Sequence, residues 1–135
     1  MSPKPVVAAV APVAEPEPVA PAEPVALPIA DAYTYSNTYA YGNCTWFVAG
    51  VKNVPSNWGN ANTWAYNASA QGYTVSNIPI VGAIAANTTD SWLGHVALVV
   101  GVDGDNVLLR EMNYNGFGII DERWTYVSNY SYIYY

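Results

Sequence analysis

The chain contains one cysteine, Cys44, and one histidine, His95. Few other side chains exchange a proton near neutral pH, so an enzyme built on this chain would most readily pair a thiolate nucleophile with an imidazole base. Each residue also has a simpler interpretation. A lone cysteine is usually a small buried apolar residue, and a lone histidine is often a hydrogen-bonded core residue. The segments around the two residues help to decide between these alternatives.

Cys44 lies in the segment Tyr-Gly-Asn-Cys-Thr-Trp-Phe-Val at residues 41–48. The apolar spacing predicts a helix that begins at or just before Cys44 and runs to about Lys52, where Asn-Val-Pro ends it. The positive end of a helix dipole and the free N–H groups of the first turn favour a thiolate. The same N–H groups could hold an oxyanion, which favours the catalytic interpretation.

His95 opens an apolar run at residues 94–100, which we expect to be a buried strand. Its side chain is the polar group of that strand and needs a hydrogen-bonding partner. Glu111 and Asn113 are candidates, because residues two apart share one face of a strand. Either could accept from the imidazole and leave its other nitrogen free to take a thiol proton. The alternative is a solvated strand end.

The pairing of two strands tests this hypothesis. A hairpin turn is predicted at residues 103–106, Asp-Gly-Asp-Asn. If the valines on either side of the turn paired directly, Glu111 would lie on the far face of the sheet from His95. An odd-length loop or a β-bulge would shift the pairing by one residue and bring His95 opposite Asn113. A catalytic arrangement therefore predicts an odd loop or a bulge here.

Four aromatic residues are candidates for the walls of a substrate groove, since sugars and extended peptides favour aromatic surfaces. They are Trp58, Trp64, Trp92 and Tyr114. The chain has 12 Tyr and 5 Trp, which must pack somewhere, so core positions are the alternative. We include all four among the predicted substrate contacts.

The coarse pattern of elements is two helices followed by strands. A second helix is predicted from Asn60, a suitable N-cap, to Gly72. Strands are predicted over residues 82–86, 95–102, 107–113, 123–127 and 131–135. This order is typical of an α+β domain in which N-terminal helices pack on an antiparallel β-sheet.

Composition divides the chain in two. Residues 1–30 hold eight of the 10 prolines, are otherwise mostly Ala and Val, and contain no aromatic residue. Proline restricts φ and removes backbone donors, so this segment is predicted to be a disordered linker. Residues 31–135 are predicted to form one domain. A signal peptide is not expected in the linker, because Pro12 and Glu15 interrupt its apolar stretch.

Charge and cysteine content exclude several classes of function. The net charge is −6 and the four basic residues form no run, so nucleic acid is not an expected partner. No run of about 18 apolar residues exists, so no transmembrane segment is predicted. A single cysteine excludes an internal disulfide and a cysteine-rich metal site. We expect a monomer.

Four segments, taken in order, resemble the cysteine, histidine-dependent amidohydrolase/peptidase (CHAP) family of bacterial cell-wall hydrolases. They are Tyr-Gly-Asn-Cys-Thr-Trp-Phe-Val at 41–48, Trp-Gly-Asn-Ala at 58–61, Gly-His-Val-Ala-Leu-Val at 94–99 and Glu-Met-Asn-Tyr at 111–114. The Cys-Thr-Trp and Gly-His-Val-Ala segments are each moderately specific, and with Glu-Met-Asn after them the match is strong. The resemblance covers about residues 37–135.

The resemblance implies a papain-like α+β fold and assigns roles within the site. Cys44 would be the nucleophile, His95 the general base and then acid, and Glu111 the residue that orients His95. Asn113 would support the ring or the oxyanion. Asn43 stands where the family often has glutamine, and we include it among the predicted substrate contacts.

The resemblance also implies a reaction, which is amide hydrolysis in peptidoglycan. The bond would be the N-acetylmuramoyl–L-alanine amide or a peptide bond of the stem or cross-bridge, and the protein would be secreted or lie at the bacterial surface. No cofactor is predicted. Some family members bind calcium through acidic residues near the nucleophile, but no acid lies between Asp31 and Cys44, so no metal site is predicted. The alternative is a non-catalytic binding or structural domain on the same scaffold.

Overall fold

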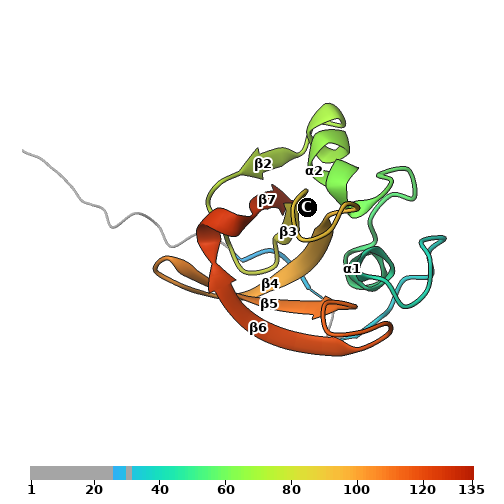
Figure 1. The fold of residues 1–135 in the computed structure, drawn as a ribbon. Coiled ribbons are helices and arrows are strands. Elements are labelled where there is room, and N and C mark those ends of the chain that lie inside the picture. Colours follow the sequence, from blue (N-terminus) through green and yellow to red (C-terminus); the bar gives the residue numbers. More distant parts are fainter. Residues whose placement is uncertain (1–25, 30–31) are drawn as a thin grey trace, which may run out of the picture.

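The computed structural model describes residues 26–29 and 32–135. These residues form two α-helices and a six-stranded sheet whose neighbouring strands are antiparallel (Figure 1). The helices are α1 (Cys44–Lys52) and α2 (Ala61–Ala70). The strands are β2 (Thr74–Ser76), β3 (Ile84–Asn87), β4 (His95–Asp103), β5 (Asn106–Met112), β6 (Ile120–Tyr126) and β7 (Ser131–Tyr134), with a short 3-10 helix, η1 (Val127–Asn129), before β7. The predicted α+β class is confirmed.

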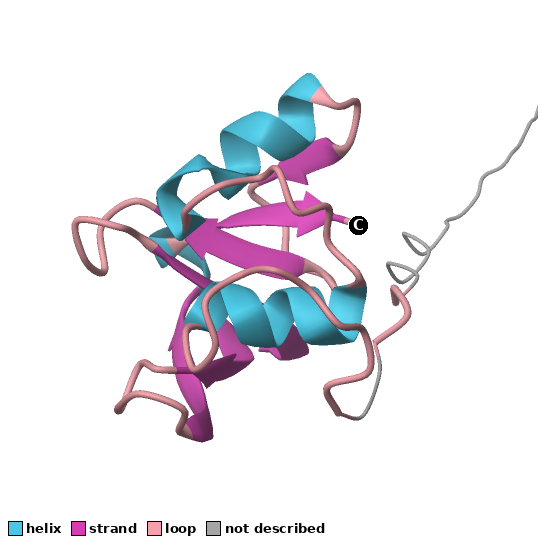
Figure 2. Cartoon of the chain, turned by 90° about the vertical axis from the view of Figure 1, so that its right-hand side faces the viewer, coloured by secondary structure: helices cyan, strands magenta, loops and turns pink. Residues whose placement is uncertain are grey.

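The strands follow the order β2-β7-β3-β4-β5-β6, so the last strand inserts between β2 and β3. Helix α1 lies against β4 and β5, and α2 lies against β3 (Figures 1 and 2). The two helices thus meet the sheet near the start of β4, which is where His95 begins its strand. This arrangement brings the N-terminus of α1 close to the first residue of β4.

A β-bulge in β4 sets which side chains share a face. Beyond the bulge, Val102 pairs directly with Val107, and Gly104 and Asp105 form a two-residue loop. The register then shifts between Val99 and Gly101, so that Leu98 pairs with Arg110. Continuing this register places His95 level with Asn113 and on the same face as Glu111. Of the two predicted alternatives, an odd-length loop or a bulge, the structure has the bulge.

Helix α1 matches its predicted bounds, whereas two strands differ from the prediction. Strand β2 was not predicted, because a three-residue edge strand carries little periodicity. Strand β6 begins at Ile120 rather than at residue 123, and its outward residues include apolar Ile120, Trp124 and Tyr126, each more than half exposed. This pattern reverses the usual alternation of apolar residues inside and polar residues outside, which hid the start of the strand.

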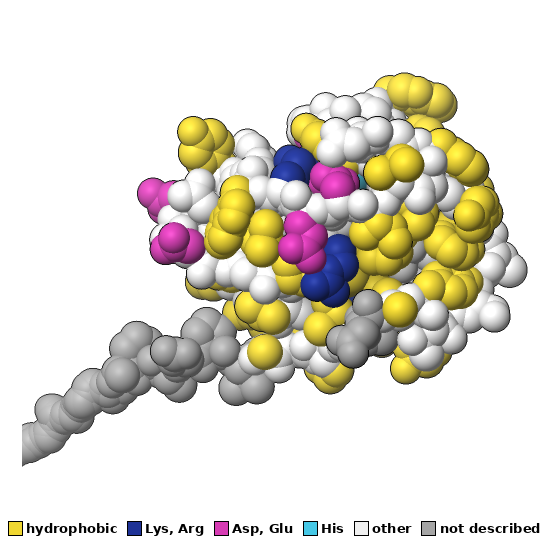
Figure 3. Space-filling view, turned by 90° about the horizontal axis from the view of Figure 1, so that it is seen from below, with side chains coloured by type: hydrophobic (Ala, Val, Ile, Leu, Met, Phe, Trp, Pro, Cys, Tyr) yellow, Lys and Arg dark blue, Asp and Glu magenta, His cyan; other side chains and the backbone are white. Residues whose placement is uncertain are grey.

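The sheet separates two apolar clusters. The cluster on the helix side contains Phe47 and Val48 of α1 together with Trp58, Trp64 and strand residues such as Leu98. The second cluster lies on the other face and includes Val99, Leu109 and Tyr132. Charged side chains are few on the exterior, and hydrophobic side chains cover much of the face seen in Figure 3.

Residues 26–29 lie against the domain. The backbone N–H of Leu27 donates to the carbonyl of Val81 at 2.8 Å, and Lys52 Nζ donates to the carbonyls of Pro28 at 2.5 Å and Gly82 at 2.7 Å. The remainder of the predicted linker, residues 1–25 and 30, lies outside the described residues. Within the described part of the chain, no helix has the length and apolar character needed to cross a membrane.

Candidate active site

The turn before α1 is hydrogen-bonded to the loop between β5 and β6. Cys44 is the first residue of α1 and Asn43 is its N-cap. Gly42 has a φ of +87°, and a Cβ there would lie 2.2 Å from the Phe117 ring. The carbonyl of Gly42 accepts from the N–H of Gly118 at 2.9 Å. Glycine is needed at this turn because a left-handed backbone and a close aromatic neighbour coincide.

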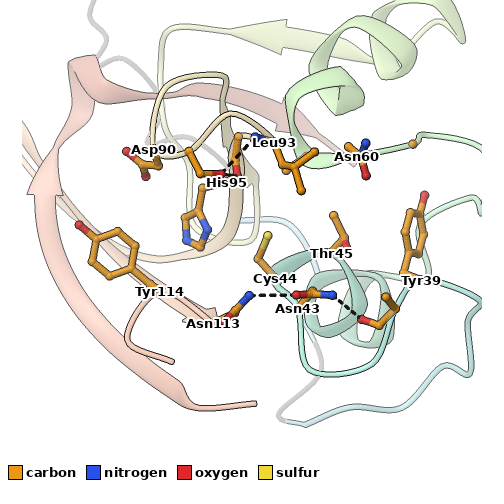
Figure 4. A pocket seen from close by; sticks show the side chains of 15 residues that line it. Tyr39, Asn43, Cys44, Thr45, Asn60, Asp90, Leu93, His95, Asn113 and Tyr114 are labelled. Carbon is orange, nitrogen blue, oxygen red and sulfur yellow. Dashed lines mark hydrogen bonds between the residues drawn. The ribbon is translucent and has the colours of Figure 1, made fainter. Parts of the chain in front are cut away.

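Cys44 and His95 lie on the wall of the same cavity, which has a volume of about 610 Å³. Figure 4 shows the sulfur of Cys44 and the ring of His95 facing each other across it. Cys44 is partly exposed and His95 is buried. The N-terminus of α1 adds unpaired N–H groups and the positive end of its dipole beside the sulfur. The structure thus brings together the two residues that the sequence singled out.

His95 is bonded to Glu111 across the β4–β5 pair. The Nε2–H of His95 donates to Oε1 of Glu111 at 2.8 Å. This bond leaves Nδ1 as the ring nitrogen available to the thiol or to a substrate, which is the tautomer arrangement that a general base requires. The register created by the bulge is what places the two side chains on one face.

The pKa of His95 is raised to about 9. Burial alone lowers it, because it disfavours the charged ring, but hydrogen bonding and charge interactions with Cys44 and Glu111 outweigh burial. His95 is therefore protonated at neutral pH. A positive imidazolium next to Cys44 stabilises negative charge on the sulfur by direct attraction.

Glu111 is fully buried and is held by a second partner that sequence analysis missed. Arg123 of β6 donates from Nε to Oε2 of Glu111 at 2.7 Å and from Nη2 to Oε1 at 3.1 Å. A buried carboxylate needs such partners, because an unpaired buried charge is strongly unfavourable. Nothing local in the sequence marks Arg123 as a partner of Glu111, because their contact depends on how β6 pairs with β5.

Asn113 is hydrogen-bonded to Asn43, the residue before Cys44, and not to His95. Its amide nitrogen donates to Oδ1 of Asn43 at 2.9 Å, and Nδ2 of Asn43 donates to the carbonyl of Ala40 at 3.3 Å (Figure 4). Asn113 has a φ of 73°, a left-handed conformation that asparagine tolerates better than most residues. Both amides line the cavity. Their bond ties the end of β5 to the start of α1.

The predicted aromatic contacts separate into three cases. Tyr114 lines the cavity, with its ring centroid 5.5 Å from that of His95. Trp58 and Trp64 are fully buried, and their indole N–H groups donate to Gln71 and to the carbonyl of Gly59. This burial contradicts the prediction that they contact substrate: each indole satisfies its donor inside the core.

Trp92 is 85% exposed and lies between Ser91 and Leu93, which both line the cavity. Its own side chain is not part of the lining. The wall also includes Asp90, from the loop between β3 and β4, which sequence analysis did not select. Among the described residues, no group of three or more His, Cys, Asp or Glu side chains is placed to hold a metal ion.

The chain is similar to staphylococcal proteins that are named secretory antigens. It is 47% identical over 87 residues to the staphylococcal secretory antigen SsaA of Staphylococcus aureus (strain NCTC 8325 / PS 47), a match that covers 61% of this chain and 33% of that protein. It is 43% identical over 100 residues to the antigen SsaA of Staphylococcus epidermidis, covering 68% of this chain and 38% of that protein. The chain therefore spans little more than a third of the length of the curated relatives it matches.

Among solved structures, the fold is similar to an N-acetylmuramoyl-L-alanine amidase from Staphylococcus aureus. The TM-score is 0.61 at 29% identity, and the match covers 69% of this chain and 30% of that one. The family model described as the CHAP domain matches residues 34–113, which include Cys44, His95 and Glu111. Because this match covers more than half of the chain, the protein belongs to the CHAP family, with the papain-like α+β fold of that family.

Proposed function

We propose that the domain at residues 31–135 is a cysteine-dependent peptidoglycan hydrolase that cleaves an amide bond. The observation that carries this proposal is the position of His95, which lies in one cavity with Cys44 and is bonded through Nε2 to buried Glu111. A thiol, an imidazole and a carboxylate in that order provide a nucleophile, a base and a group that orients the base.

In the proposed mechanism, the Cys44 sulfur attacks the carbonyl carbon and a tetrahedral intermediate forms. His95, protonated at neutral pH, delivers a proton from Nδ1 to the leaving amine, and the C–N bond breaks to leave a thioester. His95 then takes a proton from water, which attacks the thioester and releases the acid. Glu111 keeps Nε2 protonated and the ring in place throughout.

The oxyanion of the intermediate would be held by main-chain donors. The N–H of Cys44 belongs to the first turn of α1, where N–H groups have no partner within the helix. The side chain of Asn43 is a weaker candidate, because its oxygen and nitrogen are already bonded to Asn113 and Ala40. We therefore assign Asn43 and Asn113 to the support of the nucleophile turn.

The substrate class follows from relatives as well as from the site. The similar solved structure is named an N-acetylmuramoyl-L-alanine amidase, which favours the bond between the lactyl group and L-alanine over a peptide bond of the stem or cross-bridge. The similar staphylococcal proteins are named secretory antigens, which supports a secreted or surface location. The cavity of about 610 Å³ is within the usual size range of ligand-binding pockets.

The test is digestion of purified peptidoglycan by the wild-type chain and by Cys44→Ala, with fragments identified by mass spectrometry. Soluble fragments from the wild type alone are expected. Free lactyl carboxylates with new L-alanine N-termini would identify an amidase, and other new N-termini an endopeptidase. If no wall is cleaved and Cys44 does not react with iodoacetamide near neutral pH, the non-catalytic surface domain becomes the better account.

A further inference from the structure

Arg123 lies behind the catalytic residues and does not line the cavity. It reaches the site through Glu111, whose two carboxylate oxygens both accept from the guanidinium. Oε1 of Glu111 is shared, because it also accepts from His95. The Arg123 side chain is about one-fifth exposed, whereas that of Glu111 is fully buried. The hydrogen bonds from Arg123 to Glu111 and from His95 to Glu111 connect Arg123 to the ring that faces Cys44.

Arg123 is itself held from two further sides. Its Nη2 donates to the hydroxyl of Tyr130 at 2.7 Å, and that hydroxyl donates to Oδ2 of Asp90 at 2.6 Å. Burial and the hydrogen bond to Asp90 raise the pKa of Tyr130, so the hydroxyl keeps its proton. The guanidinium also lies 3.5 Å from the centroid of the Tyr114 ring. A cation over an aromatic face and a bidentate carboxylate pair fix the plane of the guanidinium.

We propose that Arg123 is a positioning residue that holds the Glu111 carboxylate aimed at His95. A buried carboxylate needs partners for both of its oxygens, because an unpaired buried charge is strongly unfavourable. Two charge-assisted hydrogen bonds from Arg123 provide those partners. Without them the carboxylate would no longer be held against the ring, and the proton would be held less tightly on His95. The consequence for turnover rests on the proposed function, whereas the effect on His95 does not.

Several acidic groups surround Glu111 and His95, so the positive charge of Arg123 offsets more than one of them. Asp121 is opposite Glu111 in the β5–β6 pairing, and its pKa is raised by burial and by the charge of Glu111. Asp90 adds a further carboxylate, 3.8 Å from Arg123 Nη2. Cys44 faces His95 from α1. Arg123 is therefore the cation that several acidic groups share, and removing it leaves them facing one another.

The experiment uses the fact that the chain has one histidine and one cysteine. NMR reports the titration midpoint of His95, and the rate of iodoacetamide alkylation reports the reactivity of Cys44, both without a substrate. The variants are Arg123→Gln, Glu111→Gln and the double variant. We expect each single variant to lower the His95 midpoint and to slow alkylation at pH 7 about tenfold or more, as loss of orientation does. The double variant should be no worse than Glu111→Gln alone, because Arg123 acts through Glu111.

Arg110→Gln is the matched control. Arg110 also pairs with a glutamate, Nε to Oε2 of Glu122 at 2.8 Å, between the same two strands. That pair is on the opposite face of the sheet from Glu111 and is partly exposed. The His95 midpoint and the alkylation rate of Cys44 should therefore be unchanged. Arg123→Lys, which keeps the charge but not the planar fork, should retain the His95 midpoint better than Arg123→Gln. Tyr130→Phe removes one bond to Arg123 and provides a milder variant should Arg123→Gln not fold.

A His95 midpoint that rises in Arg123→Gln would overturn the inference, because it would mean that Glu111 still holds the His95 proton without Arg123. Independent, additive losses of Cys44 reactivity in the double variant would overturn it as well. Failure of the proposed function looks different: peptidoglycan would remain intact while the midpoint still falls in both single variants.

Discussion

The ionisation of His95 decides what this site can do, because the ring lies between a sulfur and a buried carboxylate. Its pKa is raised to about 9. In the unfolded chain an ordinary histidine has a pKa of about 6.5. The folded state therefore binds this proton more tightly, and the stability it contributes is fully present below about pH 6.5 and is lost as the pH rises through about 9.

The raised pKa of His95 can be measured directly. The NMR titration of His95 in the wild type should have its midpoint near 9. Cys44→Ala should lower the midpoint, because interactions with Cys44 are the largest of those that raise the pKa. If protonated His95 is the acid in turnover, activity should decline above about pH 9. A wild-type midpoint at or below 6.5 would contradict the arrangement.

Residue type was enough to select Cys44 and His95, because the chain has a single thiol and a single imidazole. Spacing left Glu111 and Asn113 both open as partners of His95, and the resemblance to the CHAP family favoured Glu111. Arg123 could not be selected in the same way. It is 12 residues from Glu111 in the chain and meets it only through the pairing of β5 with β6. An ion pair between side chains on an edge strand and on its neighbouring strand has no local signature in the sequence.

At the level of helices and strands, the junction between α1 and the β5–β6 loop sets the position of Cys44. The helix itself was predictable, because its apolar spacing and the Asn-Val-Pro stop are local signals. The bulge in β4 was predictable only as one of two alternatives. Either an odd-length loop or an extra residue in one strand would place His95 and Glu111 on the same face of the sheet. The contact of Gly42 with Phe117 had no such signal.

Gly42→Ala tests this junction. The left-handed φ of +87° should cost at least about 1 kcal/mol in the free energy of unfolding, and the new methyl group must displace the Phe117 ring. Because Gly42 is two residues from Cys44, alkylation of Cys44 by iodoacetamide should slow as well. Urea unfolding and the alkylation rate are the two measurements.

Gly72→Ala supplies the comparison for that variant. Gly72 has a φ of +95° and nothing within 4 Å of an added Cβ, so it carries the backbone strain without a displaced neighbour. It follows α2 and is not part of the cavity lining. A similar loss of stability with an unchanged alkylation rate is expected. Equal slowing of alkylation in both variants would show that general destabilisation, and not the junction, controls Cys44.

For the whole molecule, the buried tryptophans belong to the core and not to a substrate groove. Trp58 and Trp64 meet edge to face with centroids 5.7 Å apart, and both are fully buried. A sequence with 12 Tyr and 5 Trp does not say which rings form the core, because aromatic residues suit both places. The helices and the sheet close around these two rings, and the exposed Trp92 remains outside the core.

Alanine substitutions at Trp58 and Trp92 should therefore have opposite profiles. Trp58→Ala removes a fully buried ring and should lower the free energy of unfolding by about 3–5 kcal/mol. Trp92→Ala removes a ring that is 85% exposed and should change it by less than about 0.5 kcal/mol. Urea unfolding followed by circular dichroism measures both.

If Trp92 contacts the polymer, its variant alone should slow peptidoglycan release at unchanged stability, with the reactivity of Cys44 towards iodoacetamide preserved. If Trp58→Ala instead left stability unchanged and slowed peptidoglycan release, Trp58 would have to contact the substrate. That result would require a different packing of α2 on the sheet.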